Sequence, residues 1–121
     1  MKENKANAAC TIYHNPHCSK SRATLALLRE NGVEPIVIEY LKTPPSASQL
    51  KSILKKLNLR PDELMRKGED LYRDLLSVKK LSDAQLIAAM VDNPILIERP
   101  IVVMGVRAVI GRPPENVLAL L

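Results

Sequence analysis

The sequence contains no phenylalanine and no tryptophan, and only three tyrosines among its 121 residues. Proteins that bind single-stranded nucleic acid stack bases on aromatic rings, and duplex binders need a dense basic stripe. The net charge of +5 is instead spread among acidic residues on helical patterns. We interpret it as a general attraction for small anions and expect no nucleic-acid partner.

Cysteine is also scarce. The two cysteines, Cys10 and Cys18, exclude a framework of several disulfides. They do not form the C-x-x-C pair of a zinc ribbon or a dithiol oxidoreductase. We expect no metal and no bound cofactor. A reducing compartment is the simpler assumption.

Long apolar runs are missing as well. Residues 1–9 carry positive charge with no apolar segment after it, so they do not resemble a secretory signal. No apolar run approaches the about 20 residues that span a bilayer. We expect a soluble, cytoplasmic protein with no membrane partner. Residues 1–9 are predicted to be a flexible extension, and the length suits a single domain over residues 10–121.

The first part of the chain predicts a βαβ unit. Residues 10–14 and 35–40 read as strands on either side of a helix over residues 19–31, with Gly32 at the helix end. The two strands of such a unit should be parallel. The second is nearly continuous in apolar character, which is typical of a strand buried on both faces.

The middle of the chain predicts helices. The Ser-x-x-Gln spacing at residues 46–49 and 82–85 is that of a capping box. Pro61 suits the first turn of a short helix between them, and a further helix is expected near residues 71–76.

The last part of the chain returns to short apolar runs. Residues 100–104 and 108–110 have the spacing of an antiparallel hairpin, and a short helix should begin at residues 113–115. The complete order is βαβ, a helical insertion and ββα. It predicts an α/β protein of the thioredoxin-like fold with a four-stranded mixed sheet.

Cys18 is the candidate nucleophile. It follows a turn at residues 15–16 and lies where the first helix begins, so free backbone N–H groups can stabilise its thiolate. Thiols in such places have pKa values lowered from about 8.5 to roughly 3.5–7.5. Arg22 lies four residues on, on the same helical face. A lone cysteine is often an inert core residue, and this interpretation suits Cys10 better than the role of a resolving thiol.

Several longer motifs carry a resemblance to a known family. They are His14-Asn15-Pro16-x-Cys18-x-x-Ser21-Arg22-x-Thr24-Leu25, Tyr40-Leu41-x-Thr43-Pro44-Pro45, Leu64-Met65-Arg66-Lys67, the run from Pro94 to Val103, and Gly111-Arg112-Pro113. From about residue 11 to residue 121 the chain resembles the glutaredoxin-coupled arsenate reductases of the ArsC type. It is similar to a shorter branch of that family and has Ser19-Lys20 where the best-studied type has Gly-Thr.

The resemblance implies a role for each matching residue. Cys18 is similar to the nucleophile that attacks arsenate and forms a thiol-arsenate adduct. The Arg99–Pro100 bond resembles the cis-proline beside the active thiol. Arg66, Arg99 and Arg112 match three arginines that hold the oxyanion. His14 matches a histidine that influences the thiol, and Asn15 and Ser21 match polar residues near it. Arg22, directly after Ser21, belongs to the same motif and is expected to support the thiol.

The resemblance also implies the rest of the reaction. Glutathione, as co-substrate, attacks the adduct, glutaredoxin resolves the resulting mixed disulfide, and arsenite leaves. We expect the protein to act as a monomer on arsenate or a similar oxyanion.

Arginine suits the oxyanion role because its planar fork binds charged oxygens bidentately and always remains charged. Arg99 and Arg112 each stand just before a proline at an element boundary, which favours a special position over an ordinary surface one. For Arg66, beside Lys67, the sequence alone leaves a surface residue and an anion ligand equally open.

Two other interpretations stay open. A glutathione-dependent thiol reductase that acts on another substrate would need Cys18 but not every arginine. A regulator resembling the Spx factors, which bind RNA polymerase, would carry C-x-x-C as its redox switch. This sequence has Cys18-Ser19-Lys20-Ser21 at that place.

Overall fold

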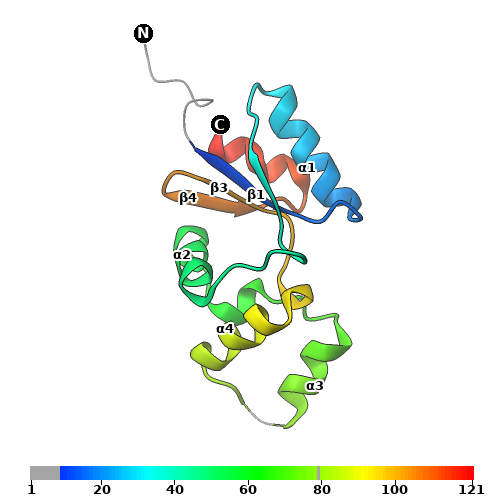
Figure 1. The fold of residues 1–121 in the computed structure, drawn as a ribbon, viewed down its shortest axis with the longest axis vertical. Helices are drawn as coiled ribbons and strands as arrows, with labels where there is room; N and C mark the ends of the chain where they lie inside the picture. Colours follow the sequence, from blue (N-terminus) through cyan, green and yellow to red (C-terminus); the bar gives the residue numbers. More distant parts are fainter. Residues whose placement is uncertain (1–8, 79) are drawn as a thin grey trace. The chain divides into compact units, whose positions relative to one another are not determined.

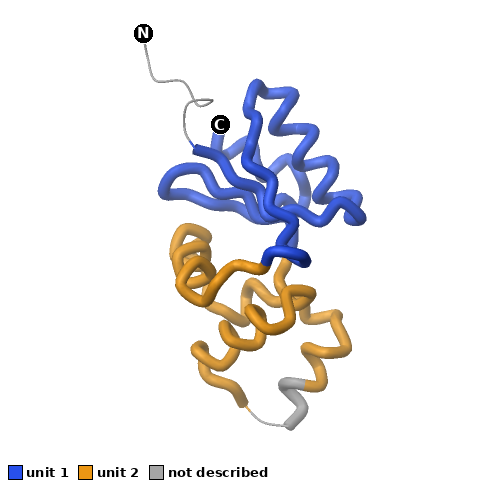
Figure 2. The backbone as a smooth tube through the Cα atoms, viewed as in Figure 1, with its two compact units in different colours: residues 1–43, 99–121 blue, residues 44–98 orange. Residues whose placement is uncertain are grey.

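The computed structural model describes residues 9–78 and 80–121, apart from the side chains of residues 75–78. The chain forms two compact units, coloured separately in Figure 2. Unit 1 comprises Met1–Thr43 and Arg99–Leu121, and unit 2 comprises Pro44–Glu98.

The predicted extension over residues 1–9 lies outside the described residues except for Ala9, which is exposed. The prediction of a single domain over residues 10–121 stays a prediction. No helix in the described ranges is both long and apolar enough for a membrane crossing.

Unit 1 carries the mixed sheet that the sequence predicts (Figure 1). Within the described residues the sheet has four strands in the order β2-β1-β3-β4. β1 is parallel to β2 and antiparallel to β3, and β3 and β4 form the expected hairpin. The elements of this unit are β1 (Cys10–His14), α1 (Ser19–Glu30), β2 (Ile36–Glu39), β3 (Ile101–Met104), β4 (Arg107–Ile110) and η4 (Pro114–Leu120).

The core of unit 1 lies between the sheet and the pair formed by α1 and η4. Ile12 of β1 and Val102 of β3 are directly opposite each other, so their side chains share a face of the sheet. Both are fully buried, in one cluster with Leu28 of α1 and Val117 of η4. This packing fixes α1 against the sheet and therefore fixes where its first turn lies.

The prediction that the second strand is buried on both faces is wrong. β2 lies at the edge of the sheet, with β1 on one side only. Ile36 and Val37 are accordingly 62% and 38% exposed. A continuous apolar run is typical of interior parallel strands, but the order in which strands join decides which of them is interior.

Unit 2 is helical, and both predicted capping boxes are confirmed. Ser46 Oγ accepts a hydrogen bond from the Gln49 N–H at 3.1 Å, and Ser82 Oγ accepts one from the Gln85 N–H at 3.2 Å. Each glutamine side chain accepts in return from the serine N–H. The elements are α2 (Ala47–Leu57), η2 (Pro61–Leu64), α3 (Asp70–Val78), α4 (Asp83–Asp92) and η3 (Pro94–Leu96).

Candidate active site

Cys18 is the N-cap residue of α1, as its position in the sequence predicts. Its backbone is extended, with φ −100° and ψ 123°, and its carbonyl accepts the first helical hydrogen bond from the Arg22 N–H at 3.0 Å. Its own N–H donates to the Asn15 carbonyl at 3.0 Å, which closes the loop before the helix. The side chain is buried and lies beside the unpaired N–H groups of the first turn.

The surroundings of Cys18 favour its thiolate. Burial raises the pKa of the Cys18 thiol, but the backbone N–H of Ser21, the charge of Arg99 and the backbone N–H of Lys20 lower it by more. The pKa of Cys18 therefore lies below the ordinary value for cysteine. For Cys10, in β1, burial alone raises the pKa of the thiol. The two cysteines differ as predicted, since only Cys18 has groups that stabilise a negative charge.

We expect the alkylation of Cys18 by iodoacetamide to reach half of its maximal rate below about pH 8.5, because only the thiolate reacts. The rate is measured across pH in a Cys10→Ala variant, so that Cys18 is the only thiol. Arg99→Ala should move the midpoint to higher pH, because it removes a charge that lowers the pKa of Cys18. A midpoint at or above about 8.5 in the parent would contradict the expectation.

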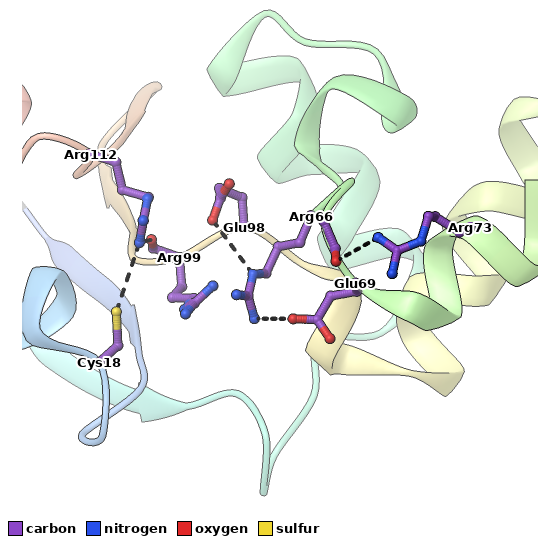
Figure 3. Close-up of polar contacts among 8 residues, drawn as sticks. Cys18, Arg66, Glu69, Arg73, Glu98, Arg99 and Arg112 are labelled. Carbon is purple, nitrogen blue, oxygen red and sulfur yellow. Dashed lines mark hydrogen bonds and ion pairs between the residues drawn. The ribbon is translucent and has the colours of Figure 1, made fainter.

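Arg99 and Arg112 are brought together at Cys18 by the hairpin of β3 and β4. The Gly111 N–H donates to the Pro100 carbonyl at 2.9 Å, so the residues before β3 and after β4 are neighbours. Arg112 Nη1 lies 3.5 Å from the Arg99 carbonyl and 3.9 Å from Cys18 Sγ, as the dashed line in Figure 3 marks. The Arg99–Pro100 bond is cis, as the resemblance predicts, and Arg112–Pro113 is cis as well.

Gly111 sets the approach of this hairpin to α1. The Thr24 hydroxyl on α1 donates to the Gly111 carbonyl at 3.2 Å. A Cβ atom at position 111 would lie 2.5 Å from Thr24 Oγ1 and 3.0 Å from Pro100 Cγ, so only glycine fits. The close contact holds Arg112, the next residue, at the helix end that carries Cys18.

His14, Asn15 and Ser21 form a hydrogen-bonded network beside the thiol. His14 Nδ1 and Ser21 Oγ are 2.7 Å apart, and the Asn15 N–H donates to the same hydroxyl at 3.0 Å. Burial lowers the pKa of His14; Glu39 raises it, and Arg29 and Arg22 lower it further. The neutral imidazole is therefore favoured. Ser21 therefore contacts two groups: its hydroxyl belongs to this network, and its backbone N–H stabilises the Cys18 thiolate.

Arg22 braces the loop before Cys18. Its Nη1 donates to the Pro16 carbonyl at 2.9 Å, and the side chain is exposed. Asn15 Oδ1 accepts from the His17 N–H at 3.0 Å and orders the same loop. The sequence predicts that Arg22 lies on the same face of the helix as Cys18. The structure adds a specific contact of Arg22 with the backbone of the loop that precedes Cys18.

Arg66 belongs to unit 2 and has acidic neighbours there. Its Nη1 lies 2.9 Å from Glu69 Oε2, and its Nε lies 4.0 Å from Glu98 Oε1 (Figure 3). Sequence reasoning missed both glutamates. The i, i+3 spacing of Arg66 and Glu69 is the signal that could have found the first.

The described residues include no group of three or more His, Cys, Asp or Glu side chains that could hold a metal ion. The chemistry that this geometry offers is that of a thiolate beside guanidinium groups. Together, fold and site define a thioredoxin-like α/β protein with its thiol at the N-terminus of the first helix.

Comparison with known proteins gives the family. The model of the ArsC family matches residues 13–120, and the chain belongs to this family. Protein YfgD of Escherichia coli K12 is 60% identical over 111 residues, which cover 90% of this chain and 93% of that protein. An arsenate reductase of Haemophilus influenzae is 51% identical over 112 residues, 91% of this chain and 97% of the relative.

Comparison with solved structures gives the same family and the same fold. The structure of an arsenate reductase from Vibrio cholerae has a TM-score of 0.90 and 52% sequence identity, and the match covers 94% of this chain and 98% of that one. The predicted thioredoxin-like fold and the predicted family are thus confirmed.

Proposed function

We propose that this protein is an arsenate reductase in which the thiolate of Cys18 attacks arsenate. The observation that carries the proposal is the distance of 3.9 Å between Arg112 Nη1 and Cys18 Sγ, with the charge of Arg99 lowering the pKa of the same thiol. A nucleophile beside two guanidinium groups suits a tetrahedral oxyanion, because the guanidinium groups neutralise the charge that would repel a thiolate. The names of the Haemophilus and Vibrio relatives support the choice of arsenate.

The proposed reaction has three steps. The Cys18 thiolate forms a bond to arsenic(V), and one arsenate oxygen leaves as water after protonation. Glutathione then attacks the adduct: the sulfur–arsenic bond breaks with its electron pair passing to arsenic, which leaves as arsenite. The two sulfurs lose one electron each and form a mixed disulfide between Cys18 and glutathione. A glutaredoxin thiol attacks this disulfide and regenerates Cys18.

We assign supporting roles to the other residues. Arg99 and Arg112 bind the oxyanion, and His14, Asn15, Ser21 and Arg22 keep the thiol and its loop in position. Arg66 is proposed as a third oxyanion ligand on the strength of the family resemblance. An external thiol is needed because Cys10 is buried in the core of unit 1, where burial raises the pKa of its thiol. We propose a monomeric enzyme of the cytoplasm.

A coupled assay tests the proposal. Purified protein is mixed with arsenate, glutathione, glutaredoxin, glutathione reductase and NADPH, and both NADPH oxidation and arsenite are measured. We expect arsenite in a one-to-one ratio to NADPH oxidised, and no turnover when glutathione is omitted. Absence of arsenite from the complete mixture would overturn the proposal.

A further inference from the structure

Arg66 is held more firmly than a surface arginine. Its side chain and that of Glu69 are each only 26% exposed, and that of Glu98 is 29% exposed. Most surface ion pairs involve side chains that move freely in water and contribute about 0–1 kcal/mol. The pair of Arg29 on α1 and Glu34, which follows that helix, is much more exposed, with side chains 50% and 72% exposed.

The backbone under Arg66 is anchored to the segment that carries Glu98. The Arg66 N–H donates to the Leu96 carbonyl at 2.7 Å, and the Glu98 N–H donates to the Leu64 carbonyl at 2.8 Å. These bonds flank an antiparallel bridge that pairs Met65 with Ile97. The four apolar residues of the two segments, Leu64, Met65, Leu96 and Ile97, are all buried.

Glu69 is held on the other side of Arg66. Its N–H donates to the Arg66 carbonyl at 3.2 Å, so the chain turns once between the two residues and returns the carboxylate to the guanidinium. Both contacts of Arg66 are ion pairs, and the one with Glu69, at 2.9 Å from Nη1, is shorter than the one with Glu98, at 4.0 Å from Nε. Glu69 therefore restricts the torsions of Arg66 more than Glu98 does.

From this geometry we propose that Glu69, assisted by Glu98, is a positioning residue that orders Arg66 for oxyanion binding. The inference rests on the proposed function, in which Arg66 is an oxyanion ligand. A long side chain that is ordered only when substrate binds costs affinity, and one that is already ordered does not. One contact to a carboxylate leaves other N–H donors of the guanidinium for the anion, since arginine has five.

The charge of Glu69 acts in the opposite direction, because a carboxylate beside Arg66 weakens its attraction for an anion. Two variants separate the two effects. Glu69→Gln and Glu69→Ala both remove the negative charge, but only glutamine keeps an oxygen that can accept from Arg66 Nη1. The difference between the two variants therefore measures the ordering of Arg66 alone.

We expect the KM for arsenate to be about 3- to 10-fold higher for Glu69→Ala than for Glu69→Gln, with kcat changed by less than about twofold. The same order should hold for arsenate affinity measured by calorimetry in a Cys18→Ser background, where no adduct forms. Glu34→Ala, which removes the carboxylate of the exposed pair with Arg29, should leave both values unchanged. Equal KM and affinity for the two Glu69 variants would overturn the inference.

A double-mutant cycle with Arg66→Ala links the effect to its target. In an Arg66→Ala background the alanine and glutamine variants of Glu69 should become equal. If Arg66→Ala alone left arsenate affinity unchanged, both the oxyanion role of Arg66 and the inference would be wrong. If the parent bound arsenate with the expected order of variants but produced no arsenite, the inference would stand and the proposed activity would fail.

Discussion

Replacement of Cys18 by serine is expected to lower the rate of arsenate reduction by at least about 10³-fold, because the variant has no thiol to bond arsenic or to form the mixed disulfide. A serine hydroxyl at the same N-cap is far less acidic, and the N–H groups of Lys20 and Ser21 cannot turn it into an effective nucleophile. The coupled assay with arsenate, glutathione and glutaredoxin measures the loss directly.

Cys10→Ala is the matched control for this variant. It removes the other cysteine, which is buried in the core of unit 1, and should keep at least about half of the parental rate. The unfolding temperature of both variants shows whether either has lost the fold. Substantial arsenite production by a folded Cys18→Ser protein would remove the central claim about the thiol.

Arg99→Ala is expected to lower kcat/KM for arsenate by about 10²-fold, since a charge aimed at a developing oxyanion contributes about that much in enzymes of known mechanism. The loss with a small disulfide substrate, such as hydroxyethyl disulfide with glutathione, should be smaller. That substrate needs the Cys18 thiolate but carries no oxyanion. Arg112→Ala should show the same difference, because its Nη1 lies 3.9 Å from Cys18 Sγ.

Two further variants make the test specific. Arg60→Ala removes an arginine whose ion pairs are with Asp62 and Glu63 in unit 2, and it should change neither activity. Arg112→Lys should recover only part of the arsenate activity, because an ammonium cannot bind an oxyanion bidentately. Equal losses with arsenate and with the disulfide would favour a general glutathione-dependent thiol reductase, the broader of the alternatives that the sequence leaves open.

The features that the sequence predicted correctly are those governed by neighbouring residues. The two Ser-x-x-Gln capping boxes, the β3–β4 hairpin and the left-handed Gly32 directly after the C-cap Asn31 of α1 are each determined within a few residues of chain. The position of Cys18 at a helix N-cap is local in the same sense, because the Asn15-Pro16 turn and the apolar period of the helix set it. The resemblance to the family motifs then identified Arg66, Arg99 and Arg112 as candidate oxyanion ligands.

Other features depend on contacts between distant segments, and only the tertiary structure decided them. β2 has the composition of an interior strand, but the sheet order leaves it at the edge, with Ile36 exposed. Arg112 approaches Cys18 across 94 residues of chain because the β3–β4 hairpin returns it to the start of α1, where Gly111 permits close contact with Thr24. The contact of Arg66 with Glu98 likewise depends on the bridge between Met65 and Ile97. Residue patterns encode hydrogen bonds and periodicity within an element, whereas strand order and the convergence of long side chains arise only when the elements pack. The sequence by itself thus determined where the thiol stands, and the tertiary structure decided which charged groups surround it.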